Sequence, residues 1–347
     1  MTKMITVKFL SKLPDKVWYR QFPDEELNWG QCRFVFDKSC DVYDWLVVYD
    51  DTPPMNNERF SNYSEQLSCP KEHTLLVTQE PHPIKVYGES YTHQFAHVLT
   101  SQTEKELPHP GRIYSQPALL WFYGMGQKQL RSFNEIAQGP KTAKQQDLSV
   151  VWSNKRQRHT TLYQRYRFLT RLKQELAGME IFGAGHTRLD DKAEALDPFR
   201  YHIAIENHVS KHHWTEKIAD AFLGGCLPFY HGCPNLDDYF PGQSFIPIDI
   251  FAIEPSIKII KQAIASNEYE KRASFIEQAR QRVLYDFNLF AVIASIIDQH
   301  HDDCLTVQDQ RIFSRRAANR KSLGVFIQHQ WNKQFFRLKY SLKNLMH

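Results

Sequence analysis

Short apolar runs that recur along the chain, each ending in a turn signal, restrict its fold more than any other feature. The runs are rich in β-branched and aromatic residues and are too short to be helices. In the first part of the chain they lie at residues 5–10, 34–36, 45–49, 74–78 and 95–99. Strands of this kind, separated by helical segments, are typical of a parallel, Rossmann-type sheet.

A second series of apolar runs follows a polar stretch at residues 139–147. We expect strands at residues 148–152, 179–182, 201–205 and 226–230, and amphipathic helices at residues 165–177 and 215–223. A chain of 347 residues is too long for one ordinary core. We therefore predict an α/β protein with Rossmann-like domains at residues 1–145 and 146–310, followed by a tail at residues 311–347.

The composition is that of an ordinary globular protein, with 42% hydrophobic and 24% charged residues. The N-terminus lacks the small-residue cleavage site of a signal peptide, and no apolar run is long enough for a transmembrane helix. The six cysteines form no C-x-x-C pair, so neither a zinc ribbon nor a disulfide framework is indicated. These features predict a cytoplasmic protein.

Positive charge is concentrated in the tail. The formal net charge is +4, but residues 311–347 contain nine Lys or Arg and no Asp or Glu, which leaves the preceding residues at −5. Apolar residues recur in this tail at Phe326, Trp331, Phe335, Leu338, Leu342 and Leu345. The pattern predicts a basic amphipathic helix able to lie on an anionic membrane. The alternative is that this helix packs on the body of the protein. No nucleic-acid recognition motif accompanies the tail, so we expect no nucleic-acid partner.

A group of polar residues follows the predicted strand at residues 201–205. The strand delivers Glu206 and Asn207 to its C-terminal end, where ligands bind open α/β sheets. Thr215 is the expected N-cap of the next helix, and Glu216 and Lys217 lie in its first turn. The unpaired N–H groups and the lysine charge suit a phosphate, and the carboxylate suits ribose or sugar hydroxyls. A plain helix cap is the alternative interpretation.

The stretch from residue 201 to 251 resembles the α1,3-fucosyltransferase family, glycosyltransferase family 10. The family pattern combines an apolar strand ending in Glu-Asn, a Thr-Glu-Lys helix start, a small-residue turn, and a strand with Pro, followed by Gly, Tyr and Phe-Pro, Ser-Phe-Ile and Asp-Phe motifs. Here these motifs lie at residues 205–207, 215–217, 224–225, 227–228, 232, 239–241, 244–246 and 249–251. Without an N-terminal membrane helix, the chain is most similar to the bacterial members.

The resemblance implies a GT-B fold, in which an acceptor domain and a GDP-fucose domain face each other across a cleft. It assigns donor binding to Arg165, Asn207, His213, Glu216 and Lys217. An arginine suits the diphosphate because its planar fork meets phosphate oxygens in pairs.

Several of these assignments have alternatives. Arg167 and Arg158 are substitutes for Arg165 on the same segment, which follows a Ser-Asn turn at residues 153–154. His213 stands where the family usually has Tyr, and we expect the adjacent His212 and His213 to be solvated rather than bound to a metal. Lys192 is expected on a helix surface, and a role in donor binding is the alternative.

Residues 75–81 resemble the family's strand that ends in Glu-Pro, and the family's proposed general base corresponds to Glu80. Inversion by direct displacement needs such a base on the side opposite the diphosphate. Because the acidic pairs of this chain are adjacent residues rather than Asp-x-Asp, we expect no metal and no other cofactor. Arg165, Lys217 and the helix N-terminus would stabilise the leaving group instead. We expect Lys217→Ala to remove transfer and leave the fold intact.

The expected reaction is therefore transfer of L-fucose from GDP-fucose to an oligosaccharide. Family analogy suggests O3 of N-acetylglucosamine in an N-acetyllactosamine-like unit, as in a lipopolysaccharide, with acceptor choice in the loops at residues 87–91 and 121–126. Three alternatives remain open: a transferase of the same fold that uses another sugar nucleotide, a non-catalytic glycan-binding relative, and nucleic-acid binding through the basic tail, which predicts steeply salt-dependent binding.

Overall fold

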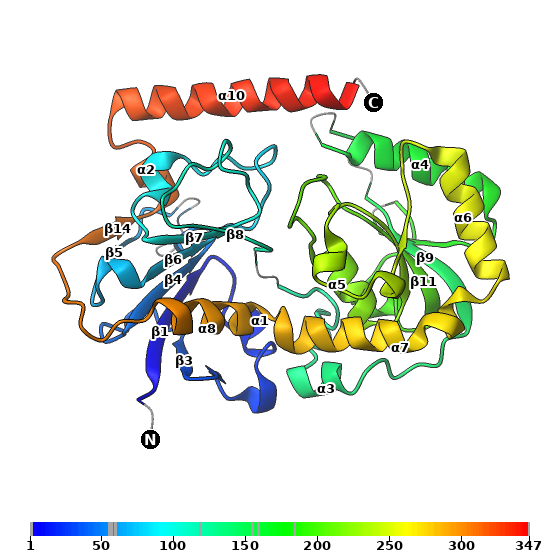
Figure 1. Ribbon diagram of the computed structural model, residues 1–347, viewed down its shortest axis with the longest axis horizontal. Helices are drawn as coiled ribbons and strands as arrows, with labels where there is room; N and C mark the ends of the chain where they lie inside the picture. The colour runs from blue at the N-terminus through cyan, green and yellow to red at the C-terminus, as the bar shows by residue number, and fades with distance from the viewer. Residues whose placement is uncertain are drawn as a thin grey trace. The chain divides into compact units, whose positions relative to one another are not determined.

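The computed structural model describes residues 3–54, 58, 61–117, 120–153, 156–157, 160–183 and 185–345. The chain forms two compact units, each built on its own sheet (Figure 1). The first unit comprises Met1–Ala118 and Leu289–Lys339, and the second comprises Leu119–Asn288 and Tyr340–His347.

The sheet of the first unit has seven strands in the order β2-β3-β1-β4-β6-β7-β8, parallel except for the β2–β3 pair. Its strands are β1 (Ile5–Ser11), β2 (Asn28–Trp29), β3 (Cys32–Val35), β4 (Trp45–Tyr49), β6 (Thr74–Val77), β7 (His97–Thr100) and β8 (Arg112–Tyr114). Every residue of β4 and β6 is buried. Burial on both faces explains why these strands are continuous apolar runs rather than alternating ones.

Short elements and much of the C-terminal part of the chain complete the first unit. They are α1 (Lys16–Tyr19), the 3₁₀ turns η1 (Pro23–Glu25) and η2 (Lys71–His73), β5 (Ser64–Gln66), α2 (Glu89–Thr92), α8 (Leu289–His300), β14 (Arg311–Phe313), α9 (Arg315–Ala318) and α10 (Leu323–Leu345) as far as Lys339. Helix α8 belongs to this unit although it follows the second one in the sequence, and its Phe290 stacks on Phe22 with ring centroids 3.9 Å apart. In the tail, β14 pairs with β5 in antiparallel fashion.

The sheet of the second unit has five parallel strands in the order β10-β9-β11-β12-β13. Its strands are β9 (Gln146–Val151), β10 (Glu180–Phe182), β11 (Phe199–Ile205), β12 (Leu227–His231) and β13 (Ile246–Pro247). Its helices are α3 (Phe133–Ala137), α4 (Leu162–Glu175), α5 (Glu216–Leu223), α6 (Ile253–Ala265), α7 (Glu268–Gln281), the short turns η3 (Lys192–Ala195), η4 (Leu236–Asp238) and η5 (Gly242–Ser244), and the π-helical η6 (Arg282–Asp286). The predicted α/β class with two parallel sheets is confirmed.

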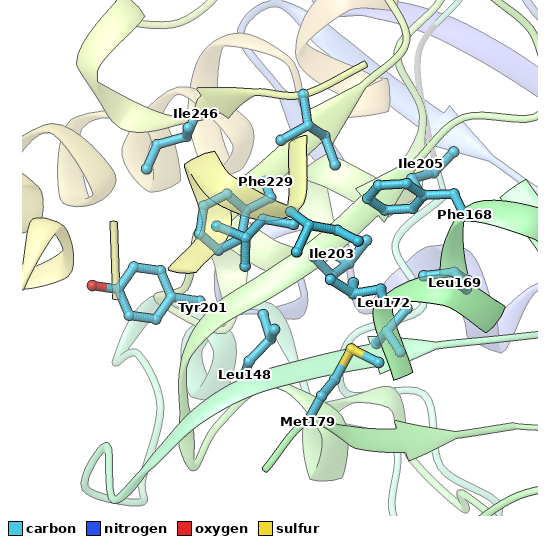
Figure 2. Close-up of a cluster of buried hydrophobic side chains, with 14 of the residues drawn as sticks. Leu148, Phe168, Leu169, Leu172, Met179, Tyr201, Ile203, Ile205, Phe229 and Ile246 are labelled. Atoms are coloured by element: carbon cyan, nitrogen blue, oxygen red, sulfur yellow. The ribbon is translucent and has the colours of Figure 1, made fainter. Parts of the chain in front are cut away.

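The core of the second unit fixes the rotation of α4. Phe168, Leu169 and Leu172 are fully buried and pack with Ile203 and Ile205 of β11 (Figure 2). Side chains three, four and seven residues apart share one face of a helix. This spacing therefore places Arg165, one turn before Phe168 and Leu169, on the buried face of α4.

The bounds of the two units differ from the predicted domains at residues 1–145, 146–310 and 311–347. Residues 119–145 group with the second unit, because Tyr123 donates to Asp197 Oδ1 at 2.7 Å and Arg131 donates to Asp197 Oδ2 at 3.1 Å. The loop at residues 121–126, expected in the N-terminal domain, belongs to the second unit for the same reason. Residues 289–310 group with the first unit through α8.

The predicted tail helix exists as α10, and several of its large apolar side chains are exposed. They are Leu323, Ile327, Trp331, Phe335, Leu338 and Leu342. Within the described ranges, no helix is both long enough and apolar enough to span a bilayer.

Candidate functional site

A cavity of about 340 Å³ lies in the second unit. Its lining comes from the ends of β9 and β11, from α4 and η3, and from the first turn of α5. Four of the predicted donor-binding residues line it together: Arg165, Asn207, Glu216 and Lys217. Ser153 and Asn207 directly follow the β9 and β11 regions, so the cavity is at the carboxyl ends of the parallel strands, as expected of open α/β sheets.

Glu206 ties the end of β11 to the start of α5. Its side chain is fully buried and accepts hydrogen bonds from Thr215 N at 2.8 Å and Thr215 Oγ1 at 2.6 Å. Gly232 is required beside it, because a Cβ atom there would lie 2.4 Å from Glu206 Cγ. The sequence indicated Glu206 only as the end of a strand, because the burial of its side chain depends on the tertiary contact with Thr215.

Lys217 is held between two carboxylates. Its Nζ atom lies 3.3 Å from Glu206 Oε2 and 3.0 Å from Glu216 Oε1, and it donates to Thr215 Oγ1 at 2.9 Å. Burial alone would lower the pKa of Lys217, but the two carboxylates raise it above its ordinary value. Burial likewise opposes the ionisation of Glu216, yet Lys217 and Lys192 lower the pKa of Glu216 to about 2. Both groups are therefore charged at neutral pH.

Arg165 is the least compensated cation of the cavity. Its side chain is buried, and its guanidinium donates to Ser153 Oγ at 2.8 Å and to Asn207 Oδ1 at 3.4 Å. No carboxylate among the described residues lies within 4.0 Å of it. Burial lowers the pKa of Arg165, and the more distant carboxylates of Glu206 and Glu216 oppose that effect only in part. Of the two substitutes, Arg167 is exposed to solvent and Arg158 lies outside the described residues.

Lys192 differs from its expected place on a helix surface. Its side chain is only 14% exposed, lines the cavity, and donates to Asp220 Oδ2 at 2.8 Å and to Glu216 O at 3.3 Å. The segment is the short 3₁₀ turn η3 rather than a helix with a solvent face, and it begins at a capping box formed by Asp191 and Glu194. That Asp-x-x-Glu spacing was a signal in the sequence that could have indicated a tightly held turn.

His213 is buried rather than solvated, contrary to expectation, whereas His212 is partly exposed. His213 is 2% exposed and is absent from the residues that line the cavity, so its predicted donor contact stays a prediction. His212 adopts a φ of 62°, and its Nδ1 atom lies 2.5 Å from the Tyr239 hydroxyl. In the part of the chain that the structure describes, no group of three or more His, Cys, Asp or Glu side chains is arranged to hold a metal ion.

Glu80 belongs to the first unit, in the bend that follows β6. Its carbonyl oxygen accepts from Gln102 Nε2 at 2.9 Å, and the amide of the preceding Gln79 donates to the Tyr87 hydroxyl at 2.8 Å. Tyr87 is itself buried and donates to Asp50 Oδ1 at 2.7 Å. The bend is thus held by buried side chains, while the Glu80 side chain is only partly buried.

Comparison with known proteins agrees with this arrangement. The family model described as glycosyltransferase family 10 (fucosyltransferase), C-terminal, matches residues 141–280. A fucosyltransferase-like protein of Arabidopsis thaliana is 30% identical over 93 residues, which cover 25% of this chain and only 18% of that protein. A crystal structure of an α1,3-fucosyltransferase has the same fold, with a TM-score of 0.52 at 15% identity, covering 89% of this chain and 92% of that one. Residues 141–280 therefore match the C-terminal domain of family 10 fucosyltransferases, in agreement with the resemblance seen in the sequence.

Proposed function

We propose that the protein is an inverting glycosyltransferase that moves L-fucose from GDP-fucose to a hydroxyl of a glycan. The observation that carries this proposal is the buried guanidinium of Arg165, which lines a cavity at the sheet edge without a carboxylate partner within 4.0 Å among the described residues. A buried cation is costly unless an anion compensates it. The diphosphate of a sugar nucleotide would supply that anion in a family 10 domain.

The other cavity residues have roles that follow from their charge and position. Lys217 adds a second cation at the N-terminus of α5, where unpaired N–H groups favour phosphate. Glu216, ionised at neutral pH, accepts hydrogen bonds from ribose or fucose hydroxyls, and Asn207 and His213 complete the donor contacts. These fixed cations stabilise the departing GDP without a metal ion, so the reaction is metal-independent.

The proposed base is Glu80. In the direct displacement, the acceptor oxygen bonds to the anomeric carbon of fucose, the bond from that carbon to the diphosphate oxygen breaks, and Glu80 takes the hydroxyl proton. The buried contacts of Tyr87 and Gln102 keep the Glu80 bend in place. From the family resemblance we propose O3 of N-acetylglucosamine in an N-acetyllactosamine-like unit as the acceptor.

A donor panel tests the choice of sugar nucleotide. Release of nucleotide diphosphate is measured with GDP-fucose, GDP-mannose and UDP-galactose, in buffers with and without EDTA. We expect GDP release from GDP-fucose alone, unchanged by EDTA. Release from another donor would support a different transferase, and release from none, together with glycan binding, would support a non-catalytic relative.

We also propose that α10 places the protein on an anionic membrane surface. Its exposed apolar side chains at residues 323, 327, 331, 335, 338 and 342 are spaced three or four residues apart and share one face. On the helical wheel Arg337 and Lys339 flank this face on its two sides, an arrangement typical of helices that lie in the interface of anionic bilayers. The protein would thus be cytoplasmic and peripheral.

A further inference from the structure

A second cavity, of about 370 Å³, lies within the first unit. It is lined by the segment after Glu80, by α2, by residues 102–108 and by the middle of α10. None of its lining residues belongs to the donor cavity described above. It is also connected to the Glu80 bend, because Gln102 lines it and donates to the Glu80 carbonyl oxygen.

The lining combines aromatic rings with hydrogen-bonding groups. Trp331, Phe335 and Phe336 of α10 supply the rings, and Trp331 is 71% exposed. The polar groups are those of His82, Glu89, Thr92, Gln102, Lys105, Glu106 and Asn332. Two carboxylates accompany one lysine, so the cavity disfavours an anionic ligand such as a phosphate. Apolar ring faces beside carboxylates and amides instead suit a sugar, a neutral ring with apolar C–H faces and many hydroxyl groups.

His82 provides a buried hydrogen-bond acceptor in this lining. The Gln102 amide nitrogen faces two carbonyl oxygens, those of Glu80 and Lys85, so its Oε1 atom is the one that lies 3.0 Å from His82 Nδ1. Because that oxygen only accepts, His82 Nδ1 carries the proton. Burial lowers the pKa of His82, which keeps the ring neutral and leaves Nε2 as an acceptor. Nε2 has no partner among the described residues.

The ring of Phe336 lies over His82, with centroids 4.0 Å apart and an interplanar angle of 69°. A ligand reaches Nε2 when this ring turns aside, and Phe336 is only partly buried. A hydroxyl group is the ligand chemistry that satisfies a neutral imidazole nitrogen, since it donates without bringing charge.

We propose that this cavity is a subsite for a neutral sugar ring of the acceptor glycan, stacked on Trp331 and Phe335 and hydrogen-bonded by the polar wall. This proposal rests on the proposed function, because the bound sugar would be part of the acceptor of that reaction. It gives α10 a role in acceptor recognition, because the cavity is lined by its residues 331, 332, 335 and 336. While glycan is bound, membrane contact would rest on the exposed apolar side chains outside the cavity, such as Leu338 and Leu342.

Isothermal titration of the full chain, without lipid, with tri-N-acetyllactosamine hexasaccharide tests the subsite. We expect wild-type binding to weaken at least tenfold in Trp331→Ala and in Phe335→Ala. Ile327→Ala is the matched control, since Ile327 is 57% exposed on the same helix and lies outside the cavity, and its affinity should stay within twofold of wild type. Equal binding by wild type and Trp331→Ala, or no binding by wild type, would overturn the proposal.

A parallel titration with GDP separates this inference from the proposed function. Retained GDP affinity in Trp331→Ala, with lost glycan affinity, assigns the defect to the subsite. Glycan binding that depends on Trp331 in a protein that binds no GDP would support the subsite and contradict the transferase.

Discussion

The ammonium of Lys217 lies 3.3 Å from the carboxylate of Glu206, a side chain with no exposure to solvent. Lys217 is therefore both the proposed phosphate ligand and the cation that partners a buried acid. Burial raises the pKa of Glu206, and Lys217 opposes that effect. This pair links the stability of the second unit to the chemistry of its cavity.

Lys217→Ala should consequently impair both stability and transfer, whereas the sequence alone indicated an intact fold. Removing one partner of a buried ion pair costs about 3 kcal/mol of unfolding free energy. The double variant Lys217→Ala/Glu206→Gln should regain much of that stability and none of the transfer. Urea unfolding and GDP-release assays of the two variants measure these effects. A single variant as stable as wild type would contradict the pairing.

Arg165→Met should weaken GDP binding at least tenfold, because the buried guanidinium would no longer compensate the diphosphate. Arg165→Lys should keep only part of the GDP affinity, since an ammonium group cannot form the bidentate hydrogen bonds of a guanidinium. Arg167→Met is the matched control, because Arg167 is exposed on the same helix. Isothermal titration with GDP measures all three, and a similar loss in the Arg167 variant would argue for a general charge effect instead.

Stability at acid pH should depend on Glu216. Its pKa in the folded protein, about 2, is below the ordinary value of 4.5. A lowered pKa adds stability above the unfolded-state pKa, and that contribution is lost as the pH falls from about 5 towards 2. Between pH 7 and pH 3 the wild type should lose about 1–2 kcal/mol more unfolding free energy than Glu216→Gln. Equal losses in urea titrations of both proteins would show that Glu216 is not held ionised by its lysines.

Leu338→Glu should reduce binding to vesicles of phosphatidylcholine and phosphatidylglycerol, because it places a negative charge on the apolar face of α10. Lys333→Gln is the control with the same change in net charge, since Lys333 lies on the opposite side of the helix. Co-sedimentation should show strong binding by wild type, weakened in high salt, and a larger loss for Leu338→Glu than for Lys333→Gln. Equal losses would show that charge alone governs binding and that the apolar face is not buried in lipid.

Much of the fold could be predicted because parallel strands buried on both faces have continuous apolar sequences. The strands at residues 45–49 and 148–152, for example, lie within a residue or two of β4 and β9. The place of Arg165 was also predictable, because Phe168, Leu169 and Leu172 mark the face of α4 on which it lies. The cluster of Arg165, Asn207, Glu216 and Lys217 in one cavity agrees with the motif spacing.

The remaining features depend on contacts between residues distant in sequence. Residues 119–145 join the second unit through Asp197, which lies beyond the polar stretch at the predicted boundary. Lys192 is drawn inward by the buried carboxylate of Asp220 on α5. His213 is buried although a polar loop surrounds it. Periodicity and composition report local structure, so they do not register such tertiary partners.

Glu80→Gln should lower the transfer rate by about 10²–10⁴ while leaving GDP-fucose affinity unchanged, since the amide keeps the shape of the side chain but cannot take a proton. Gln79→Ala, at the exposed neighbouring side chain, is the control and should remain active. Loss of GDP-fucose binding in Glu80→Gln would instead place this residue among the donor contacts.

Transfer itself is tested most directly by incubating the full chain with GDP-fucose and N-acetyllactosamine and determining the product by NMR. The expected product carries fucose on O3 of N-acetylglucosamine, with an anomeric configuration opposite to that of the donor. A product with the donor's configuration would contradict the direct displacement, and absence of any fucosylated product from this and other N-acetyllactosamine-containing glycans would contradict the proposed function.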